Sequence, residues 1–509
     1  MLRGITPYAL IFAIAGTLAA TPQSTPEATQ TSNAGLQFEV KFTESAHPGP
    51  FTGRVYVIMT SQDAGDPKDW VSWYYSPPLF ARDVKNWQPG EKMIFSADNC
   101  LAHEVDLAEL PQGHYSAQAV MDVKGWNAHP IDGTGNGYSR RVDFRYTPPS
   151  EFPVLLKIAH KQTAPKYEEE DLKLVSFRSP LLSKFHKCDI SLRALVGLPQ
   201  TYSDDPQRRF PTLYLINGYA GELTPEFTRM MMALLSGGDF DPVIVNLEAE
   251  CPTGHHAFAD SATNGPVGTA LVTEFIPHLE KTFRLLPHPN ARYLTGGSSG
   301  GWSSLWLQVT YPDFFGGTWS TSPDPVDFTA FMRINIYDPE ENMFTQPDGA
   351  PWSLTRGGYE WFSFTAQELS DLEEVLGRGG QLASFEAVFS PRGPQGTPIP
   401  LWDRGTGHLD PAVAQAWRKY DIRHIIETQW NTLGPKLEHK LFLYCGDQDT
   451  FYLERAFFKL RDTLKKLGSD AHIVVIPDAS HFLPPRVYAE LSRDMAKHYK
   501  RHGPKQNQK

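Results

Sequence analysis

Hydrophobic and polar positions alternate in the first third of the chain. Four runs show the alternation most clearly, at 36–42, 53–59, 114–123 and 140–146, with clusters of Gly, Pro, Asn and Asp between them. A period of two with turns between the runs is typical of antiparallel strands, whose successive side chains point to opposite faces. The pattern therefore predicts a small all-β sandwich domain over residues 35–147.

The pattern changes after the proline-rich stretch at 147–153, because proline favours neither helix nor ladder there. Beyond it, continuous apolar runs such as 211–218, 292–296 and 440–446 alternate with amphipathic helical segments. Buried strands that alternate with helices are typical of a mostly parallel sheet covered on both faces. We therefore expect an α/β domain over 153–503, with its functional groups on loops after the carboxyl ends of the strands.

The N-terminus resembles neither domain. Arg3 precedes an apolar run at 11–18 and two small residues, which is the pattern of a secretory signal peptide over residues 1–20. Residues 21–34 are rich in Ser, Thr, Pro and Ala and are predicted to form a flexible linker. No later apolar stretch is long enough to cross a bilayer. We therefore expect a secreted or periplasmic protein without a membrane span.

Composition excludes several classes of partner. The chain has 47 Lys and Arg against 58 Asp and Glu, a net charge of −11 that would repel phosphate backbones and anionic lipids. Its four cysteines are too few for a disulfide scaffold and too far apart for a CxxC metal site. No glycine-rich nucleotide loop is present. We therefore expect no nucleic acid, no metal and no cofactor.

Aromatic residues are frequent in the predicted sandwich domain. They include Trp70, Trp73, Tyr74, Tyr75, Trp87 and Trp126. A row of exposed rings could stack on sugars, which would give this domain a carbohydrate contact. The favoured interpretation is that the rings fill the core of the domain or its interface with the next one, because aromatic side chains bury large areas.

A serine pair follows the predicted strand at 292–296. The run Gly-Gly-Ser-Ser-Gly-Gly at 296–301 contains the GxSxG pattern twice, once at Ser298 and once at Ser299. A serine on a tight strand-to-helix turn needs glycine neighbours, because the strained backbone leaves no room for Cβ atoms. The helix N-terminus then supplies N–H groups where an oxyanion would form. The run therefore predicts a nucleophilic serine.

A serine hydroxyl needs a base to take its proton and an acid to orient that base. His481 lies in the loop after the strand predicted at 472–477, where it could reach the serine, whereas His472 begins that strand and would point away. Asp447 and Asp449 both follow the strand at 440–446. Position alone does not separate the two carboxylates, and both could instead cap the next helix.

The oxyanion needs two backbone donors. One is the N–H of the residue after the nucleophile. The other is expected on the loop after the strand at 211–218, where the N–H of Tyr219 lies between Gly218 and Gly221.

Taken together, residues of about 190–490 resemble the putative-esterase family of α/β-hydrolases, which includes enterochelin, feruloyl and acetyl esterases, S-formylglutathione hydrolases and mycolyltransferases. In that family GxSxGG is followed by Tyr/Trp-Pro and Phe-Gly. Tyr311-Pro312 and Phe315-Gly316 keep this register if Ser298 is the nucleophile. The resemblance therefore favours Ser298 over Ser299 and implies that the Ser299 N–H is an oxyanion donor.

The resemblance also separates the two carboxylates. The GxxD motif of the family falls on Gly446 and Asp449, which favours Asp449 over Asp447. Further matches lie at 214–221, 268–284 and 322–328. The implied fold is that of an α/β-hydrolase with the triad Ser298, Asp449 and His481.

The chain departs from the family pattern in two places. Asn217-Gly218 stands where the family usually has His-Gly, and a long segment separates Ser298 from Asp449. We expect residues 325–438 to be a lid insertion that contains a capped helix from Thr365 to Gly379. An aromatic approach to this helix could select the substrate or form the core of the lid; it comprises Tyr359, Trp361, Phe362 and Phe364.

These observations favour a secreted serine carboxylic-ester hydrolase that works through a Ser-His-Asp triad and an acyl-enzyme intermediate. Its substrate would be a small-molecule or polysaccharide-linked ester. Two alternatives stay open: an acyltransferase to a sugar or lipid alcohol, and a non-catalytic binding protein on a hydrolase fold. The presence of all three triad candidates, in the order Ser, Asp, His, disfavours the second.

Overall fold

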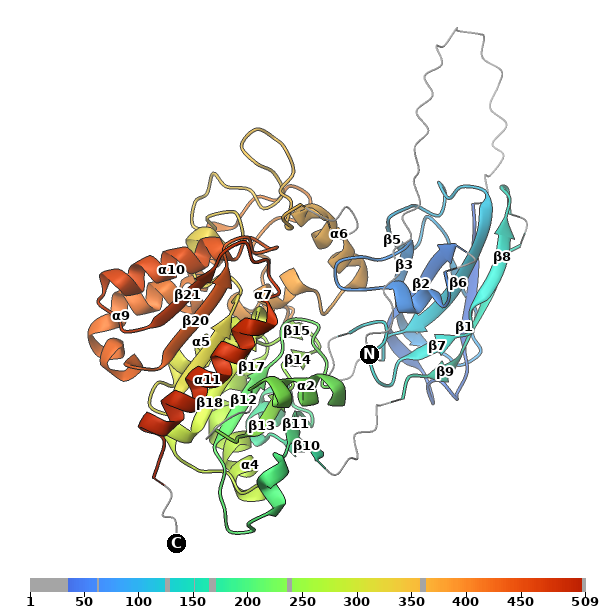
Figure 1. Ribbon diagram of the computed structural model, residues 1–509. Coiled ribbons are helices and arrows are strands. Elements are labelled where there is room, and N and C mark those ends of the chain that lie inside the picture. The colour runs from blue at the N-terminus through green and yellow to red at the C-terminus, as the bar shows by residue number, and fades with distance from the viewer. Residues whose placement is uncertain are drawn as a thin grey trace.

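The computed structural model describes residues 35–61, 64–123, 129–150, 152–163, 171–235, 240–357 and 363–505. They form an N-terminal all-β domain and a larger α/β domain (Figure 1). Several predicted features lie outside the described residues: the signal peptide (1–20), the linker (21–34), and the aromatic residues Trp126, Tyr359, Trp361 and Phe362.

Nine strands form the N-terminal domain. They are β1 (Phe38–Phe42), β2 (Phe51–Ser61), β3 (Leu79–Trp87), β4 (Met93–Phe95), β5 (Leu101–His103), β6 (Gly113–Met121), β7 (Gly137–Ser139), β8 (Val142–Tyr146) and β9 (Val154–Lys161). Their order is β4-β1-β9-β7-β6-β2-β3-β5, with β8 also paired to β6. All pairs are antiparallel except β1 with β9.

This domain differs from the predicted sandwich in two respects. The nine strands are hydrogen-bonded into one continuous sheet instead of two, because β6 pairs with β2 on one side and with both β7 and β8 on the other. Strand β9 follows the prolines at 147–153 yet pairs with β1 and β7. The first domain therefore continues beyond the stretch that the sequence indicates as its boundary.

Alternate side chains of β2 pack into two different hydrophobic cores. Val55 and Val57 face a core that strands from both halves of the sheet share, so the sheet curls around it. Tyr56 and Ile58 face the opposite way and pack against α6 (Ala366–Leu376) of the α/β domain. A period of two therefore holds on this strand, but both of its faces are buried.

Eight strands form the sheet of the α/β domain. They are β10 (Leu172–Arg178), β11 (Ser191–Gly197), β12 (Thr212–Ile216), β13 (Val243–Leu247), β18 (Arg292–Gly297), β19 (Gly317–Thr321), β20 (Leu441–Gly446) and β21 (His472–Ile476). Their order is β10-β11-β13-β12-β18-β19-β20-β21; β11 is antiparallel to both neighbours and the other pairs are parallel. The mostly parallel sheet agrees with the predicted α/β-hydrolase fold.

Helices cover both faces of this sheet (Figure 1). Besides α6, the helices of this domain are α1 (Pro180–His186), α2 (Pro225–Leu235), α3 (Val267–Ala270), α4 (Ile276–Thr282), α5 (Ser299–Thr310), α7 (Gln381–Phe389), α8 (Pro411–Trp417), α9 (Ile422–Leu437), α10 (Glu454–Lys466) and α11 (Pro485–His502). Two short ribbons precede α3, β14 (Glu250–Cys251) with β15 (Gly254–His255) and β16 (Asp260–Ser261) with β17 (Gly265–Pro266). No helix within the described ranges has the length and apolar character that crossing a bilayer requires.

The segment between β19 and β20 carries α6 to α9, where the sequence predicts a lid insertion. Thr365 and Glu368 form a reciprocal capping box at the start of α6, as the sequence pattern predicts. The helix ends at Leu376, before the predicted Gly379, because Gly377 takes a left-handed φ of 77°.

Polar contacts reinforce the apolar packing between the two domains. The Tyr56 hydroxyl donates to the Leu376 carbonyl at 2.5 Å. Arg378 forms an ion pair with Asp122 at 2.5 Å, and their side chains are 11% and 1% exposed. Removing one partner of such a buried pair leaves the other charge without compensation.

We predict that Asp122→Asn lowers the free energy of unfolding by about 3 kcal/mol, because it leaves the Arg378 charge without a compensating carboxylate in the buried interface. Asp83→Asn is the matched control, since the Asp83 side chain pairs with Arg54 but is 68% exposed. Its loss should cost less than about 1 kcal/mol. Urea unfolding of both variants measures the difference, and equal losses would contradict the prediction.

Candidate active site

Ser298 lies at the turn between β18 and α5. Its φ of 59° and ψ of −127° are strained values for a residue with a Cβ atom. Backbone strain of this kind concentrates at functional sites. Ser298 is partly exposed, whereas Ser299 in the first turn of α5 is buried.

Glycine is required on both sides of this turn. A Cβ atom on Gly300 would lie 2.0 Å from the carbonyl oxygen of Ile216 in β12, and one on Gly296 would lie 2.3 Å from the carbonyl oxygen of Gly300. Strand and helix therefore approach each other too closely for any side chain. This is the packing that the GxSxG pattern predicts.

The hydroxyl groups of both serines face one buried carboxylate. Ser299 donates to Asp324 Oδ2 at 2.5 Å, and Ser298 donates to Asp324 Oδ1 at 3.4 Å. Within the described part of the chain, no hydrogen bond joins Ser298 to His481. The structure thus shows Ser298 turned toward Asp324.

His481 and Asp449 form a buried pair. His481 Nδ1 lies 2.8 Å from Asp449 Oδ2, and the side chains are 7% and 0% exposed. The backbone N–H of Phe451 also donates to Asp449, at 2.8 Å. This arrangement directs Nδ1–H to the carboxylate and leaves Nε2 to accept a proton, as in a Ser-His-Asp triad.

The other predicted carboxylate has a different partner. Asp447 accepts a hydrogen bond from the backbone N–H of Asp478 at 2.8 Å, which ties together the loops after β20 and β21. Neither Asp447 nor Asp449 caps α10, whose N-terminus has no side-chain cap. Geometry therefore favours Asp449 as the partner of His481.

Opposing effects act on the His481 imidazole. Burial lowers its pKa, but the charge of Asp449, the hydrogen bond to it and the charge of Asp324 raise the pKa by more, so the net shift is upward. The backbone is also held in place, since the Ser322 hydroxyl donates to the His481 carbonyl at 3.1 Å. The imidazolium form is thus stabilised.

The loop after β12 lies directly against the nucleophile turn. A Cβ atom on Gly218 would be 3.3 Å from Ser298 Cβ. Because Tyr219 is the next residue, its N–H lies at the same edge of the sheet as the nucleophile turn. The Asn217 side chain donates to the carbonyl of Glu222 at 3.1 Å and braces this loop. The Ser299 N–H belongs to the first turn of α5, where backbone donors have no intrahelical acceptor.

A buried histidine supports the same loop. His255 Nδ1 accepts from the Ala257 N–H at 3.1 Å, so Nε2 carries the proton and donates to the Asn217 carbonyl at 3.0 Å. Burial lowers the pKa of His255 to about 4, so the ring is neutral near pH 7. Position in the sequence does not reveal this support, because His255 belongs to the small β14–β15 ribbon.

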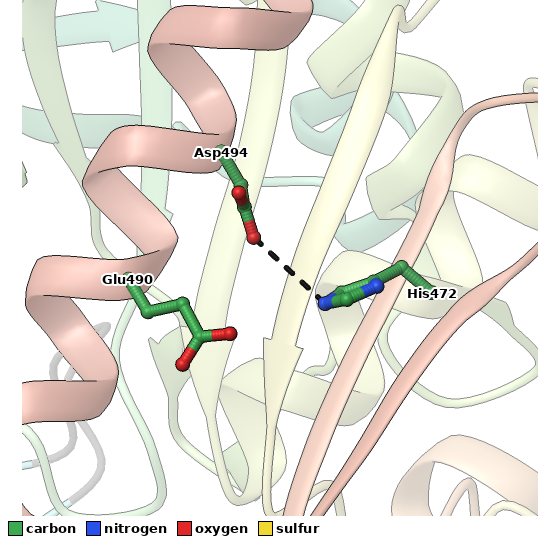
Figure 2. A group of neighbouring side chains, drawn as sticks. All are labelled: His472, Glu490 and Asp494. Carbon is green, nitrogen blue, oxygen red and sulfur yellow. Dashed lines mark ion pairs between the residues drawn. The ribbon is translucent and has the colours of Figure 1, made fainter.

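His472 lies outside the active site, as its place at the start of β21 predicts. It forms a group with Glu490 and Asp494 of α11 (Figure 2), and Nε2 is 3.8 Å from an Asp494 oxygen. The three donor atoms lie within 4.8 Å of one another and could hold a metal ion. The Lys497 ammonium, 3.5 Å from Asp494, competes for the same carboxylate.

Asp324 is the site residue that sequence reasoning missed. It belongs to the matched segment 322–328, and its position just after β19, next to the nucleophile strand, was the available signal. Burial raises its pKa to about 6, although the Ser299 hydrogen bond and the His481 charge act in the opposite direction. Its ionised form is therefore costly at neutral pH.

We predict that Asp324→Asn changes the pH dependence of stability. The folded pKa of about 6 exceeds the reference value of 3.8, so the wild type loses stability as the pH rises between these values. The asparagine variant lacks this loss, which amounts to about 3 kcal/mol at full ionisation. Urea unfolding at about pH 4 and about pH 7.5 tests this. The same variant-to-wild-type difference at both pH values would contradict it.

Residues 185–372 match the family model described as putative esterase. No curated protein matches the chain.

Solved structures give partial alignments. A ferulic acid esterase is 16% identical, over 65% of this chain and 97% of its own, with a TM-score of 0.39. The fluorophosphonate-binding serine hydrolase F of Staphylococcus aureus is 16% identical over 64% and 97%, with a TM-score of 0.37. An S-formylglutathione hydrolase from Agrobacterium tumefaciens is 14% identical over 65% and 94%, with a TM-score of 0.37.

The family match begins just before β11 and includes the loop after β12, the β18–α5 turn with Ser298, and Asp324. It supports the predicted assignment as an enzyme, a serine carboxylic-ester hydrolase. Over residues 185–372, the chain therefore matches the putative-esterase family, and this match confirms the resemblance indicated by the motifs within that range.

Proposed function

We propose that the protein hydrolyses carboxylic esters with Ser298 as nucleophile, His481 as general base and Asp449 as the group that orients His481. The observation that carries this proposal is the buried 2.8 Å contact between His481 and Asp449, on loops at the same sheet edge as the strained Ser298. A carboxylate on Nδ1 stabilises the imidazolium that forms when Nε2 takes the serine proton.

The proposed reaction begins when the Ser298 hydroxyl turns from Asp324 toward His481 and attacks the ester carbonyl. The N–H groups of Tyr219 and Ser299 hold the oxyanion. His481 returns the proton to the leaving alcohol, and an acyl group remains on Ser298. Water activated by His481 then releases the acid. This sequence of steps requires no metal or organic cofactor.

We also propose that the protein is exported and that its ester is a small molecule or is linked to a polysaccharide. The charged, apolar and small-residue succession of residues 1–20 supports export. Trp70 and Tyr75 of the N-terminal domain are 49% and 47% exposed, which supports a carbohydrate contact through their rings. Binding of the full chain to insoluble glycans, compared with a Trp70→Ala variant, measures that contact.

We predict that Ser298→Ala lowers the turnover of p-nitrophenyl acetate by about 10³-fold or more, because the nucleophile is lost. Ser299→Ala is the matched control. It removes a hydroxyl bonded to Asp324 but keeps the backbone N–H, so turnover should stay within about tenfold of wild type. Circular dichroism verifies the fold of both. A larger loss of turnover for Ser299→Ala than for Ser298→Ala would instead identify Ser299 as the nucleophile.

We predict that Asp449→Asn lowers kcat by about 10²-fold to 10⁴-fold, because the imidazolium loses its partner. Since Asp449 raises the pKa of His481, the acid limb of kcat/KM should also move to lower pH. Asp447→Asn should change kcat only a few-fold, because Asp447 bonds a backbone N–H and not His481. A pH profile that responds to Asp447→Asn instead would reverse the assignment.

A further inference from the structure

A tryptophan of the N-terminal domain reaches the loops that carry the proposed catalytic groups. Trp73 lies between η1 (Pro67–Trp70) and β3. Its ring centroid is 5.7 Å from that of Tyr219, 5.8 Å from Phe364 and 6.1 Å from Phe451. These three rings belong to the loop after β12, the insertion and the loop after β20. One side chain of the first domain thus touches three separate segments of the second.

Two of these segments carry proposed catalytic groups. Tyr219 supplies a predicted oxyanion donor. Phe451 donates its N–H to Asp449 and places its ring edge-on to His481, with centroids 4.9 Å apart and an interplanar angle of 82°. Trp73 is therefore separated from the proposed general base by a single aromatic ring.

The position of Trp73 is fixed by its own turn. The Ser72 N–H donates to the Tyr75 carbonyl at 2.8 Å, so Trp73 and Tyr74 form the tip between them. Tyr74 stacks on Phe364, with centroids 5.8 Å apart and the rings inclined by 22°. The two ends of the turn are thus hydrogen-bonded to each other within the first domain, and its tip is held by ring stacking on the second domain.

The domain interface also fixes this turn relative to the catalytic loops. The buried Arg378–Asp122 pair and the Tyr56 contact to Leu376 hold the sheet of the first domain against α6 and the residues that follow it. The Tyr219 hydroxyl donates to the carbonyl of Gly379 in that same segment. The first domain therefore stands in a defined orientation to the proposed oxyanion loop.

Trp73, Tyr219 and Phe451 each keep part of their surface exposed. Together they form an apolar, aromatic surface next to His481, and aromatic rings pack against other flat rings more favourably than their buried area alone would give. Such a surface discriminates by shape and by apolar contact, not by charge.

We propose that the N-terminal domain completes the active site, and that Trp73 is a specificity-determining residue that binds a flat ring next to the scissile ester bond. The inference rests on the proposed function. It implies that esters with such a ring are better substrates than small aliphatic esters, and that the preference depends on a residue outside the α/β domain.

The test compares three esters in the full chain: ethyl acetate without a ring, 2-naphthyl acetate with the ring on the alcohol, and ethyl 2-naphthoate with the ring on the acyl group. Trp73→Ala should lower kcat/KM for at least one naphthyl ester by about tenfold, mainly through KM, and leave ethyl acetate within about threefold. The ester that responds identifies the side of the bond that Trp73 contacts.

Controls separate specificity from folding. Phe152→Ala removes a ring that is 78% exposed elsewhere in the first domain and should leave all three esters unchanged. Trp73→Phe keeps a ring and should restore most of the preference. If Trp73→Ala does not fold, Trp73→Leu makes the same comparison with an apolar side chain that lacks a ring.

Equal losses on all three esters, or no change on any, would overturn the inference. In that case, the proposed function would still be supported if the wild type hydrolyses the esters and Ser298→Ala abolishes this turnover. If the folded wild type hydrolyses none of the three esters, the proposed function fails first, and the two failures are therefore distinguishable.

Discussion

The close approach of α5 to the central strands is the constraint on which the proposed site depends. Gly300 lies so near the Ile216 carbonyl that no side chain fits, and Gly296 is equally confined by Gly300. This contact holds Ser298 in its strained conformation and brings the Gly218 loop against it. The positions of the predicted nucleophile and of the oxyanion donors thus depend on the same close packing. Any side chain at position 300 would displace all of them together.

The second feature of the molecule is the way its domains depend on each other. The insertion between β19 and β20 packs α6 against the first domain and places Gln381 of α7 3.4 Å from the Ser299 hydroxyl. The same insertion therefore contacts the sheet of the first domain and the interior side of the nucleophile turn. It serves as a structural bridge, in addition to any role in covering the substrate. The buried Arg378–Asp122 pair lies at this bridge, and loss of either partner would leave the other charge uncompensated between the domains.

The local sequence pattern was sufficient to predict an element where one short segment alone determines its structure. The period of two predicted the strands that include β1, β2, β6 and β8, and the capping box predicted the start of α6. It was insufficient where partners come from distant segments. Strand β9 joined the first sheet because its edges pair with β1 and β7, which no local signal shows. Asp324 and Trp73 likewise acquire their significance only from neighbours on other loops.

The choice between the two serines shows the same limit on a smaller scale, because the pattern admits both registers while the backbone places Ser298 at the turn and buries Ser299. The role of Ser298 is tested most directly by labelling the folded protein with a fluorophosphonate and locating the adduct by fragment-ion mass spectrometry. A nucleophilic Ser298 predicts a single adduct on its hydroxyl. An adduct on Ser299, or none on a protein that is folded, would contradict it.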